Sequence, residues 1–158
     1  MVTLLAATMI LSPVDGLAVG AQAVFEARSQ PGAVVRSSSL TGKPSVILLW
    51  GPWSNGSARA LVALSNLSKT QRKARFIALA SWDEPKNVTS FLATVRGVDL
   101  EIWIDPAGKN ATESIAVKAF KTRRFPSVYV LNSRQMVVGS FLGYKPGDDI
   151  AGLIDRAD

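Results

Sequence analysis

The sequence predicts an α/β fold in which a central sheet carries helices on both faces. The apolar run Val46–Trp50 has the length and the β-branched and aromatic residues of a buried strand. A turn at Gly51-Pro52 follows it, and a helix is expected from Ser54 to about Arg72. A second apolar run, Arg75–Ser81, comes soon after this helix. Because a strand, a crossover helix and a second strand form a βαβ unit, the two strands should run parallel.

The segment before this unit is predicted to hold a strand or a short hairpin. Residues Val24–Arg36 are expected to form an opening strand or a hairpin, with Gln30-Pro31-Gly32 as the turn. Ser37–Ser39 is expected to be a loop. The helix that opens at Ser54 then carries an apolar side formed by leucines at three-residue spacing, namely Leu61, Leu64 and Leu67.

The middle of the chain predicts another helix, a strand and a further helix. A turn at Trp82–Pro85 leads into a helix over Lys86–Arg96, which Gly97 should end. A short strand is expected at Leu100–Ile104, and a helix at Asn110–Lys121.

The C-terminal part predicts a hairpin and a last helix. A strand is expected to begin after Pro126 and to end at Leu131. Proline is tolerated at the beginning of a strand. Asn132–Gln135 is the expected turn, and Met136–Leu142 the expected edge strand. Asp148 should cap a helix over Asp149–Arg156.

The composition restricts the chemistry that this chain can perform. Its 158 residues suit one domain with a single core. The chain has no cysteine, so disulfide exchange, thiolate catalysis and zinc–thiolate binding are excluded. It also has no histidine, the usual general base and the commonest transition-metal ligand. The sequence therefore predicts neither a metal nor a cofactor. The net charge of +6 suggests acidic partners or an anionic surface, and the simpler interpretation is a solvated basic surface.

Residues 1–23 are predicted to be an export signal, and residues 24–158 the mature domain. Val2–Val14 is mostly apolar, and Ala21-Gln22-Ala23 fits the small-x-small cleavage pattern, although no basic residue precedes the apolar run. The alternatives are an uncleaved membrane anchor and an ordinary N-terminal element. The apolar run is shorter than the roughly 20 residues of a spanning helix. We therefore expect a periplasmic or otherwise extracytoplasmic protein, attached to a membrane only if the segment is retained.

Two motifs resemble those of the thioredoxin superfamily, and more narrowly of the exported TlpA-type thiol–disulfide reductases and redoxins. The stretch Leu49-Trp50-Gly51-Pro52-Trp53-Ser54-Asn55-Gly56-Ser57 is similar to their Phe-Trp-x-x-Trp-Cys-x-x-Cys, and Leu40-Thr41-Gly42-Lys43-Pro44 to their Leu-x-Gly-Lys-Pro. Pro126 fits the position of the family's cis-proline. The resemblance implies a thioredoxin-like fold with a mixed sheet. It also implies the helix–strand insertion of the TlpA and redoxin branch, here between Pro85 and Asp105.

Serine stands at both positions where these proteins have cysteine. Ser54 and Ser57 cannot form a disulfide, and a serine hydroxyl is far less acidic than a thiol. Leu48 stands where the family often has a buried acidic residue. Ser54 is predicted to be the N-cap of the helix, and Ser57, one turn in, is expected to tolerate alanine. A natural loss of the cysteines and an engineered replacement both remain open.

The resemblance also implies a groove that contacts an extended peptide, because the loop before the cis-proline lies against the motif turn in this family. The residues expected to form it at one end of the sheet are Trp53, Ser54, Asn55, Gly56, Ser57, Arg124, Phe125 and Pro126. Arg124, together with Lys121 and Arg123, should make the rim of this groove basic and favour acidic segments.

The favoured function is that of an exported, redox-inactive module that binds a polypeptide or a partner protein, with no nucleic acid involved. One alternative is a TlpA-type thiol–disulfide oxidoreductase whose cysteines were changed to Ser54 and Ser57. Another is an anion-binding module that uses the N–H groups at the helix start.

Overall fold

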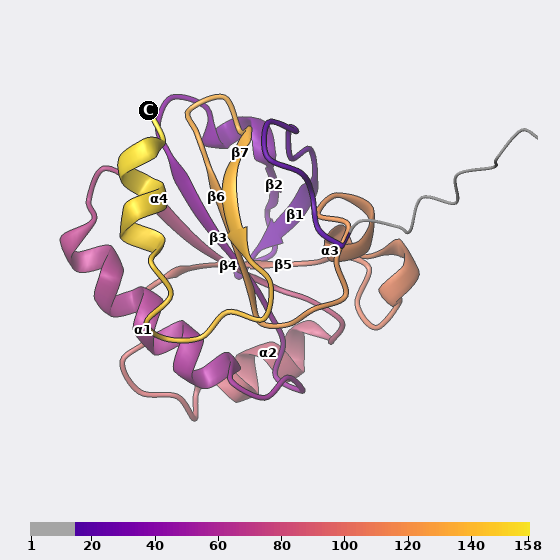
Figure 1. The fold of residues 1–158 in the computed structure, drawn as a ribbon. Helices are drawn as coiled ribbons and strands as arrows, with labels where there is room; N and C mark the ends of the chain where they lie inside the picture. The colour runs from indigo at the N-terminus through magenta and orange to yellow at the C-terminus, as the bar shows by residue number, and fades with distance from the viewer. Residues whose placement is uncertain (1–14) are drawn as a thin grey trace, which may run out of the picture.

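The computed structural model describes residues 15–158, which form one mixed sheet with helices packed on both faces (Figure 1). Over these residues the sheet is seven-stranded, in the order β2-β1-β5-β4-β3-β6-β7. The predicted α/β fold class is therefore confirmed. The strands are β1 (Glu26–Ser29), β2 (Val34–Arg36), β3 (Ser45–Trp50), β4 (Arg75–Ala80), β5 (Glu101–Ile104), β6 (Ser127–Leu131) and β7 (Val137–Phe141).

The helices divide between the two faces of this sheet. Buried residues of α1, α2 and α4 share one hydrophobic cluster, and those of α3 belong to the cluster on the other face. In Figure 1, α1 and α4 accordingly lie on one side of the strands and α3 on the other. The helices are α1 (Ser57–Thr70), α2 (Pro85–Leu92), α3 (Ile115–Lys118) and α4 (Ile150–Arg156), with 3-10 turns at Ser37–Leu40 and Ala111–Glu113.

Strand β3 is the centre of the core and is buried along its whole length. It pairs in parallel with β4 and antiparallel with β6, so the predicted βαβ unit is confirmed. Its side chains alternate between the two hydrophobic clusters: Val46, Leu48 and Trp50 face α1 and α4, whereas Ile47 and Leu49 face α3. A strand covered on both faces explains why this run is almost continuously apolar.

The segment before β1 is bonded into the domain. The Gly16 N–H donates to the Lys121 carbonyl at 2.8 Å, and the Val137 N–H donates to the Ala21 carbonyl at 2.8 Å. Residues 1–14 of the expected export signal lie outside the described residues, and cleavage after Ala23 stays a prediction. Across residues 15–158, every helix is too short or too polar to cross a bilayer.

The boundaries of three helices differ from the sequence predictions. Helix α1 begins at Ser57 rather than Ser54 and ends at Thr70, and α2 ends at Leu92, four residues before Arg96. The last helix has Asp149 as its N-cap, because the Asp149 carboxylate accepts the Gly152 N–H at 2.9 Å. The carboxylate of Asp148 instead accepts the Lys145 N–H in the preceding loop.

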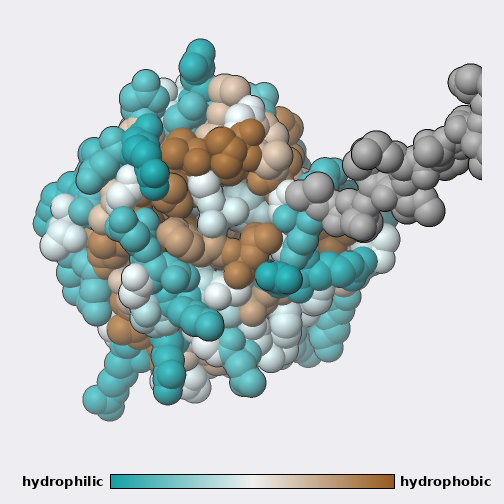
Figure 2. Space-filling model, viewed as in Figure 1, coloured by the Kyte–Doolittle hydropathy of each residue, from teal (hydrophilic) through white to brown (hydrophobic). Residues whose placement is uncertain are grey.

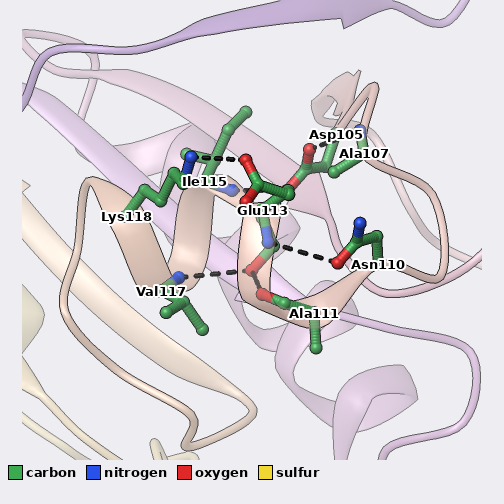
Figure 3. Close-up of polar contacts among 9 residues, drawn as sticks. Asp105, Ala107, Asn110, Ala111, Glu113, Ile115, Val117 and Lys118 are labelled. Atoms are coloured by element: carbon green, nitrogen blue, oxygen red, sulfur yellow. Dashed lines mark hydrogen bonds and ion pairs between the residues drawn. The ribbon is translucent and has the colours of Figure 1, made fainter.

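The prediction of a single helix at Asn110–Lys121 is also wrong, because Ser114 interrupts it and a new helix begins after this residue. The backbone of Ser114 is extended, which separates the 3-10 turn from α3. Ser114 is the N-cap of α3, because its Oγ accepts the Val117 N–H at 3.3 Å. The buried carboxylate of Asp105 accepts the Ile115 N–H at 2.7 Å and the Ala107 N–H at 2.9 Å, so a side chain ten positions before Ile115 adds a second cap (Figure 3). Burial raises the pKa of Asp105, while these two N–H groups act in the opposite direction.

Tyr129 links the N-terminal segment to the core and should make the free energy of unfolding vary with pH in the alkaline range. Its buried hydroxyl donates to the Phe120 carbonyl at 3.0 Å and accepts the Leu17 N–H at 3.2 Å. Burial raises the pKa of Tyr129 to about 12. An unfolded tyrosine ionises near pH ~10, so between these values the unfolded chain loses a proton that the folded chain keeps. The free energy of unfolding should therefore fall as pH rises through this interval.

Urea unfolding at closely spaced pH values, together with the ultraviolet absorbance of tyrosinate, measures this effect. The Tyr129→Phe variant is the control, and its stability should fall less over the same interval. Because burial and the Asp148 charge also raise the pKa of Tyr144, a smaller dependence should remain in the variant. A wild-type stability that is flat or rises between pH ~10 and ~12 would contradict the assignment.

Candidate functional site

The candidate site lies at the carboxyl ends of β3 and β4. Because the two strands are parallel, the turn after Trp50 and the residues after Ala80 lie at the same edge of the sheet. The Ser81 N–H donates to the Trp50 carbonyl at 2.8 Å and continues the pairing to this edge. This is the end of the sheet where the sequence predicted a binding groove.

The turn into α1 differs from the predicted helix cap. The Ser54 N–H donates to the Gly51 carbonyl at 3.0 Å, and the Ser57 N–H donates to the Ser54 carbonyl at 3.3 Å, so two successive turns precede the helix. Gly56 is the N-cap, with φ of 87° and no side-chain cap. A positive φ suits glycine, which has no Cβ to clash. The prediction that Ser54 caps the helix is therefore wrong.

The two serines of the motif have different environments. Ser57 is fully buried, and its Oγ accepts the Gly51 N–H at 3.3 Å. Ser54 is partly exposed, and its hydroxyl makes one long contact of 3.4 Å to the Asn55 carbonyl. The expectation that Ser57 tolerates alanine is therefore contradicted, because its hydroxyl satisfies a buried backbone donor.

Three aromatic rings form a cluster beside this turn. Trp53 stacks on Trp82 with ring centroids 5.2 Å apart, and Phe125 lies 5.0 Å from Trp53 and 4.7 Å from Trp82. The indole N–H of Trp53 donates to the Ser81 carbonyl at 3.0 Å, yet 45% of Trp53 stays exposed. The cluster therefore gives the site a fixed apolar wall with one open face.

Trp82 is a site residue that the sequence analysis missed and treated only as part of a turn. Its φ of 61° directs the chain away from the end of β4, and its indole N–H donates to Ser114 Oγ at 2.9 Å. Its place directly after a parallel strand was the available signal, because the carboxyl ends of such strands meet at one edge. Trp50, by contrast, is a core residue that packs against Phe91.

Gly51 is required by the position of the Trp53 ring. A Cβ on Gly51 would lie 2.3 Å from the indole nitrogen of Trp53 and 2.9 Å from the Ser81 carbonyl oxygen. Any larger residue here would displace the ring that covers the turn. The Gly-Pro-Trp sequence thus fixes the wall of the site as well as its turn.

A groove of about 360 Å³ runs beside the aromatic cluster. Four of the expected binding residues line it, namely Asn55, Gly56, Phe125 and Pro126, joined by Tyr144 and its neighbours in the loop before α4. The Phe125–Pro126 peptide bond is cis. Within residues 15–158, neither the N–H nor the carbonyl of Phe125 has a hydrogen-bond partner. Ser57 does not reach this groove, because it is buried beneath the turn.

The basic rim differs from the one predicted. Arg124 forms an ion pair with Asp15 at 2.9 Å, and Arg123 lies over the Trp82 ring at 5.9 Å. Neither of these arginines lines the groove, which instead has Arg59 and Lys145 along it. Arg59 stands two positions after Ser57, the last residue of the motif. Its place near the start of the predicted helix was a signal that the sequence analysis could have used. Lys145 lies in an irregular loop for which the sequence offered no signal.

The side chains at the site offer binding surfaces rather than nucleophiles. The chain has no cysteine or histidine, and Leu48 is fully buried at the position of the family's acidic residue. No cluster of candidate metal ligands occurs within residues 15–158. An open aromatic face, unpaired backbone groups at Phe125 and two cationic side chains are the groups that a ligand would meet.

Comparison with known proteins identifies relatives of this arrangement. Residues 18–154 match the family model described as Redoxin. A putative thiol:disulfide interchange protein DsbE from Chlorobium tepidum has 19% identity and a TM-score of 0.75, over 89% of this chain and 97% of that one. A putative thiol-disulfide oxidoreductase from Bacteroides vulgatus has 19% identity and a TM-score of 0.72, over 90% and 98%.

A secreted Mycobacterium tuberculosis disulfide oxidoreductase homologous to E. coli DsbE has 17% identity and a TM-score of 0.65, over 84% of this chain and 95% of that one. These similarities establish a thioredoxin-like fold. Comparison with curated protein sequences gives no significant match.

The two motif serines should contribute unequally to stability. Ser57→Ala should lower the free energy of unfolding by about 1–2 kcal/mol, because the buried Gly51 N–H loses its acceptor and the better helix propensity of alanine offsets only part of that loss. Ser54→Ala should change it by less than about 0.5 kcal/mol. Urea melts of both variants at neutral pH measure the difference. A larger loss for Ser54→Ala would mean that the helix starts at Ser54 after all.

Proposed function

The chain belongs to the redoxin family, and we propose that within this family it is a redox-inactive member that binds an extended polypeptide. The observation that carries the proposal is the groove at the carboxyl ends of β3 and β4. Phe125 lines this groove and has unpaired backbone groups within residues 15–158, and the motif beside it has no sulfur. The exposed ring of Trp53 does not line the groove but packs against Phe125 at its edge.

Backbone pairing is the interaction that suits this groove to a polypeptide. Phe125 precedes β6, and its N–H and carbonyl have no partner within residues 15–158. An extended peptide that runs past Phe125 can bond to both groups, as in other cases of strand addition. Trp53 then offers its exposed face to a side chain of that peptide. Binding by backbone groups supports recognition of many sequences.

The chemistry of the motif supports a function without electron transfer. A thiol–disulfide exchange step requires a thiolate, and Ser54 has only a hydroxyl. Ser57 is engaged in a buried hydrogen bond with Gly51. Leu48, an apolar residue, stands where a relative could keep a proton-transfer group. The alternative of an oxidoreductase therefore applies to a parent sequence with cysteine at positions 54 and 57.

Export is part of the proposal. One similar structure is that of a secreted protein, and the apolar stretch Val2–Val14 has the character of an export signal. The hydrogen bonds of Gly16 and Ala21 to the rest of the domain favour a processing site before Asp15 over one after Ala23. Mass spectrometry of the exported protein distinguishes the two sites, and a full-length chain in the soluble cytoplasm would contradict export.

Redox inactivity predicts that the purified chain does not reduce insulin above the buffer background. The Ser54→Cys/Ser57→Cys variant should form an intramolecular disulfide in air, because positions 54 and 57 align with the two cysteines of the motif that this chain resembles. It should be a slow reductase, since Leu48 supplies no base for proton transfer. A Leu48→Asp change on the double-cysteine background tests that reason and should raise the rate. Insulin reduction by the wild-type chain would refute the proposal.

Polypeptide binding is tested with reduced, carboxamidomethylated α-lactalbumin, which is unfolded and has no free thiol. Labelled probe should bind wild-type protein in fluorescence anisotropy. Phe125→Ala should weaken binding by about tenfold, equal to about 1.4 kcal/mol, because one wall of the groove is lost. Val34→Ala is the matched control, since Val34 is an exposed apolar residue on the edge strand β2, away from the groove. Equal effects of the two variants would argue against the groove.

A further inference from the structure

A second groove, of about 490 Å³, lies on the outer side of α1 and adjoins the first. Arg59 and Pro146 line both grooves, so the two adjoin at these residues. The wall of the second groove is mainly apolar and is made by Ala58, Val62, Ala63, Val95 and Pro146.

The outer side of α1 is less polar than a solvated helix face should be. The residues of α1 that face the sheet are buried and include Leu61 and Leu64. The opposite side of a surface helix normally carries charged and polar residues, yet Val62 and Ala63 are only partly covered there. Figure 2 shows that apolar areas interrupt the polar surface on one face of the molecule. A contiguous apolar depression on a monomer is typical of an interaction site.

Positive charge is concentrated where the two grooves meet. Arg59 and Lys145 are exposed and line the first groove, and neither has an ion-pair partner within residues 15–158. No acidic side chain lines either groove. The nearest described carboxylate in the sequence, Asp148, accepts the backbone N–H of Lys145. The positive end of the α1 dipole adds to the potential at Arg59.

We propose that the polypeptide bound by this protein carries an acidic side chain between Arg59 and Lys145 and continues as an apolar segment along the outer side of α1. This proposal rests on the proposed function and adds the sequence character of the partner. Charge complementarity places the acidic residue of the peptide between Arg59 and Lys145. The apolar lining of the second groove assigns the segment that follows it, because that segment would remove Val62 and Val95 from water.

The experiment is a selection of random dodecapeptides displayed on phage against immobilised protein. Peptides enriched on the wild-type protein should contain Asp or Glu next to a cluster of apolar residues. Selection on Arg59→Gln/Lys145→Gln should lose the acidic residue and keep the apolar cluster. Selection on Val62→Gln should lose the apolar cluster and keep the acidic residue. Lys69→Gln/Arg72→Gln, which removes the same charge at the other end of α1, is the matched control and should leave the enriched sequences unchanged.

A synthetic peptide from the wild-type selection then gives the magnitude. Replacing its acidic residue by the corresponding amide should weaken binding to wild-type protein by roughly three- to tenfold, as expected for partly exposed ion pairs. The same replacement should have no effect on the Arg59→Gln/Lys145→Gln variant, and added salt should reduce the difference.

The outcomes separate this inference from the function on which it rests. Enriched peptides that need Phe125 but are indifferent to Arg59, Lys145 and Val62 would overturn the inference and leave polypeptide binding intact. Failure to enrich any peptide on the wild-type protein would overturn both. Circular dichroism of each variant establishes that the changes have not unfolded the domain.

Discussion

The parallel pairing of β3 with β4 is the constraint on which the rest of the structure depends. It sets the carboxyl ends of both strands at one edge of the sheet, and β3 is fully buried because β6 pairs with its other side and a hydrophobic cluster covers each face. The turn after Trp50 and the residues after Ala80 therefore meet, although some thirty positions separate them in the sequence. Trp53 and Trp82 stack there, and Phe125 joins them from the loop before β6. A site at this edge follows from the topology before any side chain is considered.

Hydrogen bonds hold the turn after β3, which in this chain contains serine and no cysteine. Ser57 accepts the Gly51 N–H inside the protein, and Gly51 lies close under the ring of Trp53. Ser54 is nearer the surface and contributes little to the turn through its side chain. The inner position thus has a structural role in stabilising the turn. The outer position is free of such a role and stands next to Asn55, which lines the groove proposed to bind a polypeptide.

The cationic side chains near the site also fall into two groups, those that contact other residues of the domain and those that line the groove. Arg124 is paired with Asp15, and Arg123 lies over Trp82, so both help to attach the loop before β6 to its surroundings. Arg59 and Lys145 have no comparable attachment within residues 15–158 and line the groove. Net charge alone indicated an acidic partner, but only the structure shows that Arg123 and Arg124 contact Trp82 and Asp15 whereas Arg59 and Lys145 line the groove.

The sequence by itself determined the order of strands and helices, the βαβ unit and the end of the sheet that holds the site. Periodicity, turn residues and the lack of cysteine and histidine suffice for these because they act locally or by exclusion. Tertiary structure decided the helix starts and the accessible groups. Asp105 caps α3 from ten residues away, Gly56 replaces Ser54 as N-cap, and the groove pairs Arg59 with Lys145. The Asp105 contact and the meeting of Arg59 with Lys145 join distant segments, so no local pattern encodes them. The start of α1 at Gly56 depends on how the turn packs, with Ser57 buried beneath Gly51.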